Sequence, residues 1–298
     1  MKVSLRWVSV VCFLLPVQCW AFDWSPDTTR YLSDPSFIPS KGQLESVSSF
    51  EYSNTNEDWR YISGVVTQHY FSKKDLYTQN FIYGVTSRLR LNADASFSES
   101  KSKDTYTNSS SPTEFESHGF NNPSFGALYR LIEQKKIPFN FDGYFHYTPD
   151  IVYNGEEVIG GEFHISRELK SLTVQASAGF NHFSPAKSSF GSYWGYNVGV
   201  ESQLRLSKRW AINSGVAVNQ LTDLSVNNTT SRISYLEKHD GTVTPYATLH
   251  FSVIPNRVVL GLRYSHAFIG DATDTGYYKG AWINQSQNMY SALLRVLF

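Results

Sequence analysis

Apolar and polar residues alternate with a period of two along most of this 298-residue chain. The clearest run, LRLNADASFS, covers residues 89–98, and a second covers residues 171–182. Because successive side chains of a strand point to opposite faces, each run predicts a strand with one apolar and one polar face. Runs of this kind predict about twelve strands, near residues 43–53, 76–85, 89–99, 120–131, 138–148, 158–167, 171–182, 192–205, 209–219, 242–253, 257–267 and 286–298.

The connections between these strands alternate between tight and long. Tight turns are expected at residues 86–88, 133–136, 168–170, 207–208 and 255–256, and long polar loops near residues 55–73, 101–118, 149–157, 183–192, 220–240 and 268–284. Short turns at one end and long loops at the other are typical of bacterial outer-membrane barrels, whereas a soluble sandwich requires no such asymmetry. The sequence therefore predicts an all-β, antiparallel up-and-down transmembrane barrel in the cell outer membrane, surrounded by lipid and lipopolysaccharide.

The first residues have the layout of a secretory signal peptide. Lys2 and Arg6 form a positive start, a short apolar stretch follows, and Cys19 and Ala21 are small residues at the −3 and −1 positions of a cleavage site. Cleavage after Ala21 would remove both cysteines. Disulfides, thiolate metal sites and cysteine nucleophiles would then be excluded together.

The chain is thus expected to have three parts: a signal peptide at 1–21, a lead-in segment at 22–42 and the barrel at 43–298. Prolines in the lead-in segment discourage regular structure. The simpler interpretation is a periplasmic segment that precedes the first strand. The alternative is a plug that reaches into the lumen of the barrel.

Composition agrees with a barrel and narrows the partners. Aromatic residues make up 15% of the chain, charged residues 17%, and the mean hydropathy is −0.32. No stretch after the signal approaches the roughly 18–20 apolar residues of a membrane helix, and a barrel needs apolar residues only at alternate positions. Loss of the signal leaves 24 basic against 26 acidic residues. A net charge near −2 gives no reason to expect nucleic acid as a partner.

The last strand carries a more specific pattern. Apolar side chains occupy every second position, and the final residue is aromatic. This arrangement resembles the terminal signature of outer-membrane barrels. The resemblance implies that periplasmic chaperones and the barrel-assembly machinery recognise this strand, with an assembly signal made of Tyr290, Leu294, Val296 and Phe298.

The polar faces of the predicted strands carry charges of both signs. Ions on the lipid side would cost about 2–4 kcal/mol each at the midplane, so these residues are expected to face the lumen. The expected lumen-lining residues are Arg90, Asp94, Arg130, Asp142, His146, Glu162, His164, Glu201, Arg205, His250, Arg263 and Arg295, with Glu45 and Glu51 on the same face. The near-equal mix of signs argues against strong selectivity for anions or cations.

Two interpretations of these charges remain open. In the first, opposite charges pair across a narrow lumen and fill it. In the second, the same residues line a water-filled path and tune which solutes pass. Small inward-facing residues favour the second interpretation, because they are expected to leave space. These residues are Gly126, Gly179, Gly195, Gly199, Gly215 and Gly261.

Neither a metal nor another cofactor is expected. His146, His164 and His250 could bind a metal only if they converged, and they come from strands that lie far apart in order. The chain contains no HExxH sequence, phosphate-binding glycine loop or nucleophile elbow. The sequence therefore predicts histidines with structural partners and no enzyme.

One short segment offers an alternative. Residues 179–184 (GFNHFS) place His182 and Ser184 in the lipid-facing register at the outer rim. The segment is similar to part of outer-membrane phospholipase A, and the lipid A deacylases also carry a His-x-Ser pair there. The resemblance implies an outer-leaflet lipid hydrolase in which His182 and Ser184 are catalytic. Here Pro185 stands where those families have an asparagine after the serine. The segment that supplies the phospholipase's third catalytic residue, which orients the histidine, is matched only weakly by residues 192–194 (SYW).

A second resemblance covers more of the chain. Residues 83–91 (YGVTSRLRL) look like the "YGxTxRLxL" stretch common in barrels of the meta-pathway phenol-degradation transporter type. Residues 120–130 (FNNPSFGALYR) are similar to the segment that follows in those barrels. The match covers about residues 76–131 together with the hairpin plan. It implies passive outer-membrane transport of small compounds, hydrophobic compounds among them.

We therefore expect an outer-membrane channel or passive transporter for small solutes. An outer-leaflet lipid hydrolase acting through His182 and Ser184 is one alternative, and a surface-exposed binding or adhesion barrel is another. High conductance in a planar bilayer would favour the channel. Release of lysophospholipid or deacylated lipid A would favour the hydrolase.

Overall fold

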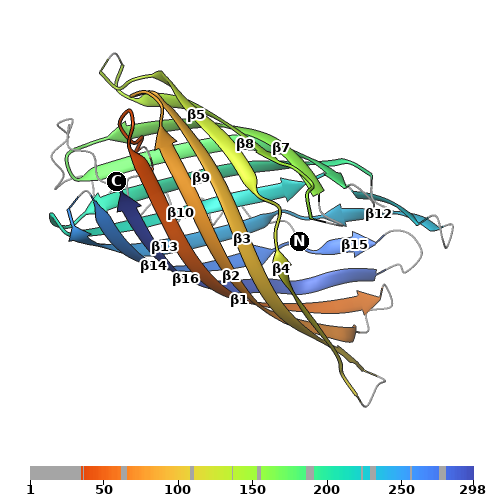
Figure 1. Cartoon of the computed structure of the whole chain (residues 1–298). Helices are drawn as coiled ribbons and strands as arrows, with labels where there is room; N and C mark the ends of the chain where they lie inside the picture. The colour runs from red at the N-terminus through yellow and green to blue at the C-terminus, as the bar shows by residue number, and fades with distance from the viewer. Residues whose placement is uncertain are drawn as a thin grey trace.

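The computed structural model describes residue 35 and residues 37–298, apart from 62–65, 108–110, 136, 153–155, 186–190, 223, 229–232, 256 and 275–279. Its strands form one antiparallel sheet, and twelve of them form the wall of a closed barrel (Figure 1). The barrel closes because β1 (Leu44–Tyr61) pairs with β16 (Gly280–Leu297) along most of its length. The predicted fold, an all-β antiparallel barrel of about twelve strands, is confirmed.

Each wall strand pairs with the next one along the chain. Between β1 and β16 the wall contains β2 (Val66–Gly84), β3 (Leu89–Tyr106), β5 (Ser124–Ile132), β6 (Asn140–Thr148), β7 (Glu156–Glu168), β8 (Leu172–Pro185), β9 (Tyr193–Arg205), β10 (Trp210–Leu221), β13 (Thr242–Ile254) and β14 (Val258–Ile269). Four further strands extend this wall at its long-loop end: β4 (Thr113–Phe120), β11 (Leu224–Asn228), β12 (Ile233–His239) and β15 (Ala272–Asp274). In the part of the chain that the structure covers, no helix is long and apolar enough to cross a membrane.

The outer face of the wall is apolar and the inner face is largely polar. On β14, the outward-facing Leu260, Leu262 and Tyr264 are exposed, whereas the inward-facing Ser265 and Val259 are buried. A water-soluble protein keeps such large apolar patches covered. Similar rows on the other wall strands form an apolar belt around the barrel, and this belt requires a lipid bilayer.

Hydroxyl side chains close two of the tight turns. Thr86 Oγ1 accepts hydrogen bonds from the backbone N–H groups of Arg88 and Leu89, at 3.1 and 2.9 Å. Ser207 Oγ accepts from the N–H groups of the residues two and three positions later, at 3.2 and 3.1 Å. Such hydroxyl-stabilised turns reverse the chain without glycine. Because outer-membrane barrels have their short turns in the periplasm, we call this the periplasmic end and the opposite one the extracellular end.

Four segments predicted as long polar loops are mainly strand. The ends of β1 and β2 occupy most of residues 55–73, and β3 and β4 occupy most of residues 101–118. Likewise, β10, β11 and β12 occupy most of residues 220–240, and β14, β15 and β16 most of residues 268–284. These parts of the strands lie beyond the apolar belt, and there the alternation of apolar and polar residues is too irregular to predict strands. Backbone pairing and cross-strand ion pairs still hold them, as between Lys101 Nζ and Glu116 Oε1 at 2.8 Å.

Candidate functional site

The inward-facing charged residues lie at two levels of the barrel. A periplasmic layer contains Arg90, Arg130, Asp142, Arg205, His250 and Arg295, together with Glu45. An extracellular layer contains Asp94, His146, Glu162, His164, Glu201 and Arg263, together with Glu51. Arginines predominate in the first layer and carboxylates in the second, so the near-equal mix of signs in the sequence is separated along the barrel axis.

Arg130 forms the central ion pair of the periplasmic layer. Its side chain is 0% exposed, and its Nε and Nη2 donate to the two carboxylate oxygens of Asp142 at 2.8 and 3.0 Å. Its Nη1 also lies 3.9 Å from Glu168 Oε1. This bidentate geometry is the strong form of an arginine–carboxylate pair. The sequence placed Arg130 and Asp142 on this face but missed Glu168, because Glu168 falls at a predicted turn.

Residues 37–43, which we call the N-terminal segment, enter the periplasmic end of the lumen. Phe37 packs against Val259 and Leu297, and its carbonyl accepts a hydrogen bond from Arg90 Nη1 at 2.7 Å. This part of the predicted lead-in therefore lies inside the barrel and not below it. Residues 1–34, which hold the predicted signal peptide and most of the lead-in, lie outside the described residues.

A glycine in the wall allows this close approach. A Cβ atom on Gly84 would collide with the backbone oxygens of Pro39 and Ser40. Two backbone hydrogen bonds join the N-terminal segment to Gly84, from Gly42 N to Gly84 O at 2.8 Å and from Gly84 N to Gln43 O at 3.0 Å. The apolar residues immediately before the first predicted strand are the signal in the sequence that could have indicated an inserted segment.

The carboxylates of the extracellular layer accept hydrogen bonds from side chains that are not arginine or lysine. Glu162 accepts from Asn197 Nδ2 at 2.8 Å and contacts His164 Nε2 at 2.9 Å. Glu51 accepts from the Ser291 hydroxyl at 3.1 Å. The positive charges that balance acids in the periplasmic layer are thus replaced here by amide, imidazole and hydroxyl donors.

Glu201, on β9, repeats this arrangement. It accepts hydrogen bonds from the Tyr246 hydroxyl at 2.6 Å and from Gln175 Nε2 at 3.2 Å. Arg263, the arginine of this layer, lies over the Tyr246 ring with its guanidinium carbon 4.0 Å from the ring centre. The arginine is therefore held by an aromatic face as well as by nearby charge.

A cavity of about 170 Å³ lies in the lumen between the two layers. Its lining residues are Asn80, Ile82, Arg90, Asn92, Tyr144, Glu162 and His164. Asn92 Nδ2 donates to the Tyr144 hydroxyl at 3.3 Å. The sequence predicted the charged members of this lining but missed its neutral polar members, although the same alternation places them on the inward face. This cavity is the candidate site for a solute.

The three predicted lumen histidines do not converge. His146 stacks beside Tyr144 at 5.5 Å between ring centres, His164 contacts Glu162, and His250 is buried in the periplasmic layer. Within the described ranges, no group of three or more His, Cys, Asp or Glu residues could hold a metal ion. His164 has a hydrogen-bond partner in Glu162, whereas His146 Nδ1 and His250 Nδ1 are buried without one.

The inward-facing glycines do not leave empty space, and this part of the prediction was wrong. A Cβ on Gly126 would lie 2.5 Å from the Tyr144 hydroxyl, and one on Gly215 would lie 2.7 Å from the Tyr246 ring. A side chain from a neighbouring strand lies over each of the six glycines and fills the volume that the missing side chain leaves. The six are Gly126, Gly179, Gly195, Gly199, Gly215 and Gly261.

His182 and Ser184 lie together on the outer face near the extracellular end. Ser184 Oγ is 3.4 Å from His182 Nδ1, and the Trp194 ring lies 4.7 Å from the imidazole centre. Glu157 is the cross-strand partner of Ser184, but its carboxylate bonds the Tyr147 hydroxyl. Among the described residues, no carboxylate or amide contacts His182 to orient it as a general base.

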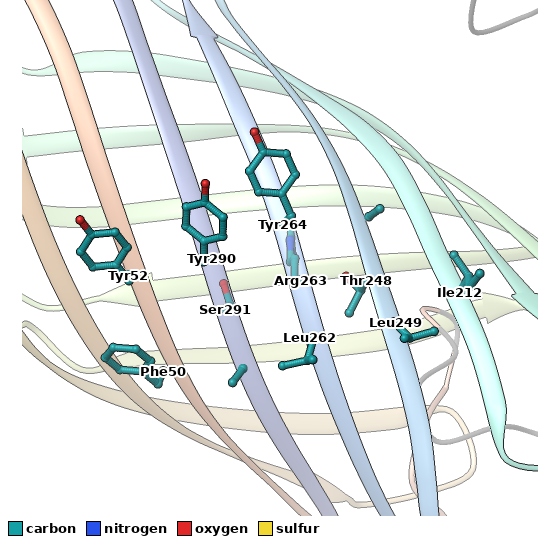
Figure 2. A pocket seen from close by; sticks show the side chains of 12 residues that line it. Phe50, Tyr52, Ile212, Thr248, Leu249, Leu262, Arg263, Tyr264, Tyr290 and Ser291 are labelled. Atoms are coloured by element: carbon teal, nitrogen blue, oxygen red, sulfur yellow. The ribbon is translucent and has the colours of Figure 1, made fainter.

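A second, larger depression of about 720 Å³ lies on the lipid-facing side of the wall (Figure 2). Its lining residues are Phe50, Tyr52, Ile212, Ala247, Thr248, Leu249, Leu262, Arg263, Tyr264, Tyr290, Ser291 and Ala292. Aromatic side chains stand along it on neighbouring strands, as Figure 2 shows. The depression belongs to the apolar belt and is separated from the lumen by the strands. The residues of the predicted assembly signal, Tyr290, Leu294, Val296 and Phe298, lie on this same outer face of the barrel.

No protein-family model matches this chain, and no curated protein sequence matches it significantly. Solved structures do resemble it. The COG4313 outer membrane channel from Pseudomonas putida F1 superposes with a TM-score of 0.58 at 12% identity, covering 91% of this chain and 100% of that chain. The transport unit of the autotransporter AIDA-I from Escherichia coli gives a TM-score of 0.52 at 8% identity, covering 90% and 92%.

At these identities the likeness concerns the fold alone. It agrees with the closed wall and with the apolar belt around it. The prediction of an outer-membrane barrel is confirmed. The chain is a β-barrel of the Gram-negative outer membrane.

Proposed function

We propose that this protein is a passive channel for small solutes, open toward the extracellular side and closed at the periplasmic end in the structure described above. The observation that carries the proposal is that the closure includes residues 37–40, which precede the wall and do not belong to it. A barrel that served only as a scaffold would have no need of a separate closing segment. The polar extracellular layer and its cavity provide the route by which a solute approaches this closure.

The N-terminal segment is held by contacts of two kinds. Phe37, Ile38 and Pro39 are buried, and hydrogen bonds join the segment to Arg90 and to the backbone of Gly84. The segment lies outside the wall ladder, so it can leave the lumen without breaking the pairing of the wall strands. Withdrawal of the segment would expose Arg90, which its backbone now covers, and would open a water path along the inner wall.

The comparison agrees with this proposal at the level of architecture. The similar structure from Pseudomonas putida F1 is called an outer membrane channel. The fold places both termini of the wall at the periplasmic end, where β1 begins beside the end of β16. A segment that precedes β1 is therefore positioned to cover that opening.

Conductance in a planar bilayer tests the proposal. The mature chain, residues 22–298, should conduct weakly, and a variant that lacks residues 22–40 should conduct several times more, because the obstruction is removed. Gln43 is kept in the variant, because its carbonyl bonds Gly84. Heat-modifiable migration on gels checks that both barrels are folded. Absence of conductance in both proteins at every voltage would show that the protein is not a channel.

Outer-leaflet lipid hydrolysis gains no specific support. The Ser184–His182 distance of 3.4 Å is at the long limit of a hydrogen bond, and the nearest cross-strand acid is engaged elsewhere. Purified protein should therefore release no fatty acid from phospholipid or lipid A, and Ser184→Ala should leave conductance unchanged. Release of fatty acid that disappears in Ser184→Ala would establish the enzyme instead.

A further inference from the structure

The lumen cavity contains hydrogen-bonding atoms without partners. Asn80 lines the cavity, and its Oδ1 is buried and accepts no hydrogen bond. Arg90 also lines it, and its Nε is buried and donates none. A buried polar atom that lacks a partner is unfavourable, so these atoms need a ligand or water. One of the two is an acceptor and the other a donor.

Further unsatisfied acceptors lie close to this cavity. Asn197 donates to the cavity residue Glu162 through its Nδ2, and its Oδ1 is buried without a partner. Asn181 lies on the neighbouring strand, and its Oδ1 is also buried without a hydrogen-bond partner. Of the buried atoms without a partner near the cavity, the three asparagine oxygens accept, Arg90 Nε donates, and His146 Nδ1 can do either. A ligand that carries several O–H groups supplies the missing donors, and each O–H can also accept.

The charged groups of the cavity are already engaged. Glu162 is bonded by Asn197 and His164, and Arg90 donates to the carbonyl of Phe37. A charged solute would have to displace these internal partners. An apolar solute would leave the unsatisfied atoms without hydrogen bonds, and Ile82 is the one apolar side chain among the seven that line the cavity in the described structure. A neutral polar solute avoids both costs.

An aromatic surface borders the cavity. The Tyr144 ring lies 5.5 Å from His146 at an angle of 29°, and 6.3 Å from His164. Aromatic faces carry a negative potential that favours contact with the positive edges of other groups, and the C–H face of a sugar ring is such a partner. The volume of about 170 Å³ is enough for several water molecules and therefore for one small ring.

We infer that this cavity binds a small neutral polyhydroxylated solute, of the size of a pentose or hexose, and holds it between the mouth of the barrel and the N-terminal segment. The inference rests on the channel proposed above and names the class of its solute. Asn80 Oδ1 accepts from one hydroxyl group, Arg90 Nε donates to another, and the Tyr144 ring supports the face of the molecule.

Saturation-transfer NMR on the full mature protein in detergent tests this site, with D-arabinose and D-glucose as probes. The wild type should bind at least one of the two saturably. Asn80→Leu, which removes one hydrogen-bond acceptor, should weaken binding about fivefold, the effect of about one lost hydrogen bond. Tyr144→Leu, which removes the supporting ring, should also weaken binding, and both variants leave the charges unchanged. Ser265→Ala removes a buried lumen hydroxyl on β14, away from the cavity, and should bind as the wild type does.

Two further probes separate the other solute classes. Glycine represents a zwitterion and toluene an apolar ring. Displacement of the sugar by either one at lower concentration would overturn the inference, as would absence of sugar binding or equal binding by Asn80→Leu and the wild type. Because the readout is binding, it is independent of conductance. A barrel that conducts ions but binds no sugar contradicts only the site, and one that binds sugar but never conducts contradicts only the channel.

Discussion

Two arginines on the inner wall, Arg130 and Arg263, show how different the two ends of the lumen are. Arg130 is fully buried in the periplasmic layer and is bonded by both oxygens of Asp142. Arg263 is only partly buried in the extracellular layer and lies over the ring of Tyr246. We propose that the same residue type on the same face serves a packed, ion-paired seal at one end and a hydrated vestibule at the other. Under this proposal, each of the two interpretations that the sequence left open applies to one end of the barrel.

The largest effect should come from removing the buried guanidinium. Arg130→Gln leaves Asp142 and Glu168 without their cation in a dry layer, and should destabilise the barrel by about 3–5 kcal/mol. Arg263→Gln, the matched variant in the vestibule, should cost about 1 kcal/mol or less, because water replaces the lost contact. Urea unfolding in detergent, followed on gels by heat-modifiability, measures both. Equal losses for the two variants would remove the distinction between seal and vestibule.

A substitution in the wall should loosen the N-terminal segment without touching it. In Gly84→Ala, the new methyl group meets the backbone of Pro39 and Ser40, so the segment must move. We expect a loss of about 1–3 kcal/mol and a rise in conductance toward that of the variant that lacks residues 22–40. Gly119→Ala is the control, because nothing lies within 4 Å of a Cβ at that position. A stable Gly84→Ala barrel with unchanged conductance would show that the segment does not close the path.

The two faces of β16 should respond differently to truncation. Leu297 faces inward and packs in the Phe37 cluster, whereas Phe298 faces lipid and is 71% exposed. Phe298→Ala removes this side chain but keeps the backbone hydrogen bonds with Leu44, and should cost the folded barrel about 1–2 kcal/mol at most. We propose that it nevertheless lowers the amount inserted in cells severalfold, because the residue belongs to an assembly signal. Leu262→Ala, at an equally exposed position of the belt, should insert normally. Normal insertion of Phe298→Ala would exclude this role.

The smallest effect concerns the extracellular ends of the strands, beyond the belt. Desolvation acts to raise the pKa of Asp58, but hydrogen bonds from Asn284 and His69, and the charge of His69, outweigh it and hold this pKa below its usual 3.8. A lowered carboxyl pKa stabilises the fold above the unfolded value, and this contribution is lost as the pH falls through the folded value.

Because the Asp58 carboxylate is partly solvated, we expect it to contribute less than about 1 kcal/mol to the free energy of unfolding. Limited proteolysis of the ends of β1 and β2 should be faster at pH 3 than at pH 7. Asp58→Asn should remove most of that difference. An unchanged pH dependence in the variant would assign the effect to other groups.

The fold could be read from the sequence because the bilayer imposes a simple rule on the wall. Outward residues such as Leu91 and Leu262 must be apolar, so the alternation marks every strand that crosses the membrane. Beyond the belt this constraint ends, and the outer parts of β1 to β4, together with β11, β12 and β15, were predicted as loops. Pairing of polar strands depends on backbone hydrogen bonds and cross-strand contacts, and these leave no period in the sequence.

The sequence predicted which residues of the candidate site face the lumen, but not which of them contact one another. Alternation places Arg130 and Asp142 on the inner wall, yet their pairing depends on a register that the sequence does not state. The inward glycines indicated an open lumen only because their cross-strand neighbours were unknown. Tyr144, which lies over Gly126 and borders the cavity, comes from the next strand in the wall. The free volume in the lumen depends on each inward-facing residue together with its cross-strand neighbours, so it cannot be predicted from the sequence of one strand.

The unequal length of the wall strands gives the barrel a slanted rim. β2 has 19 residues and β3 has 18, whereas β6 has nine. At about 3.3 Å per residue the long strands reach about 60 Å, and a membrane crossing needs only about 9–11 residues. The wall at β2 and β3 therefore extends further beyond the membrane than the wall at β6. In the channel proposed above, a solute that diffuses along the membrane surface would reach the mouth first at the side of β6.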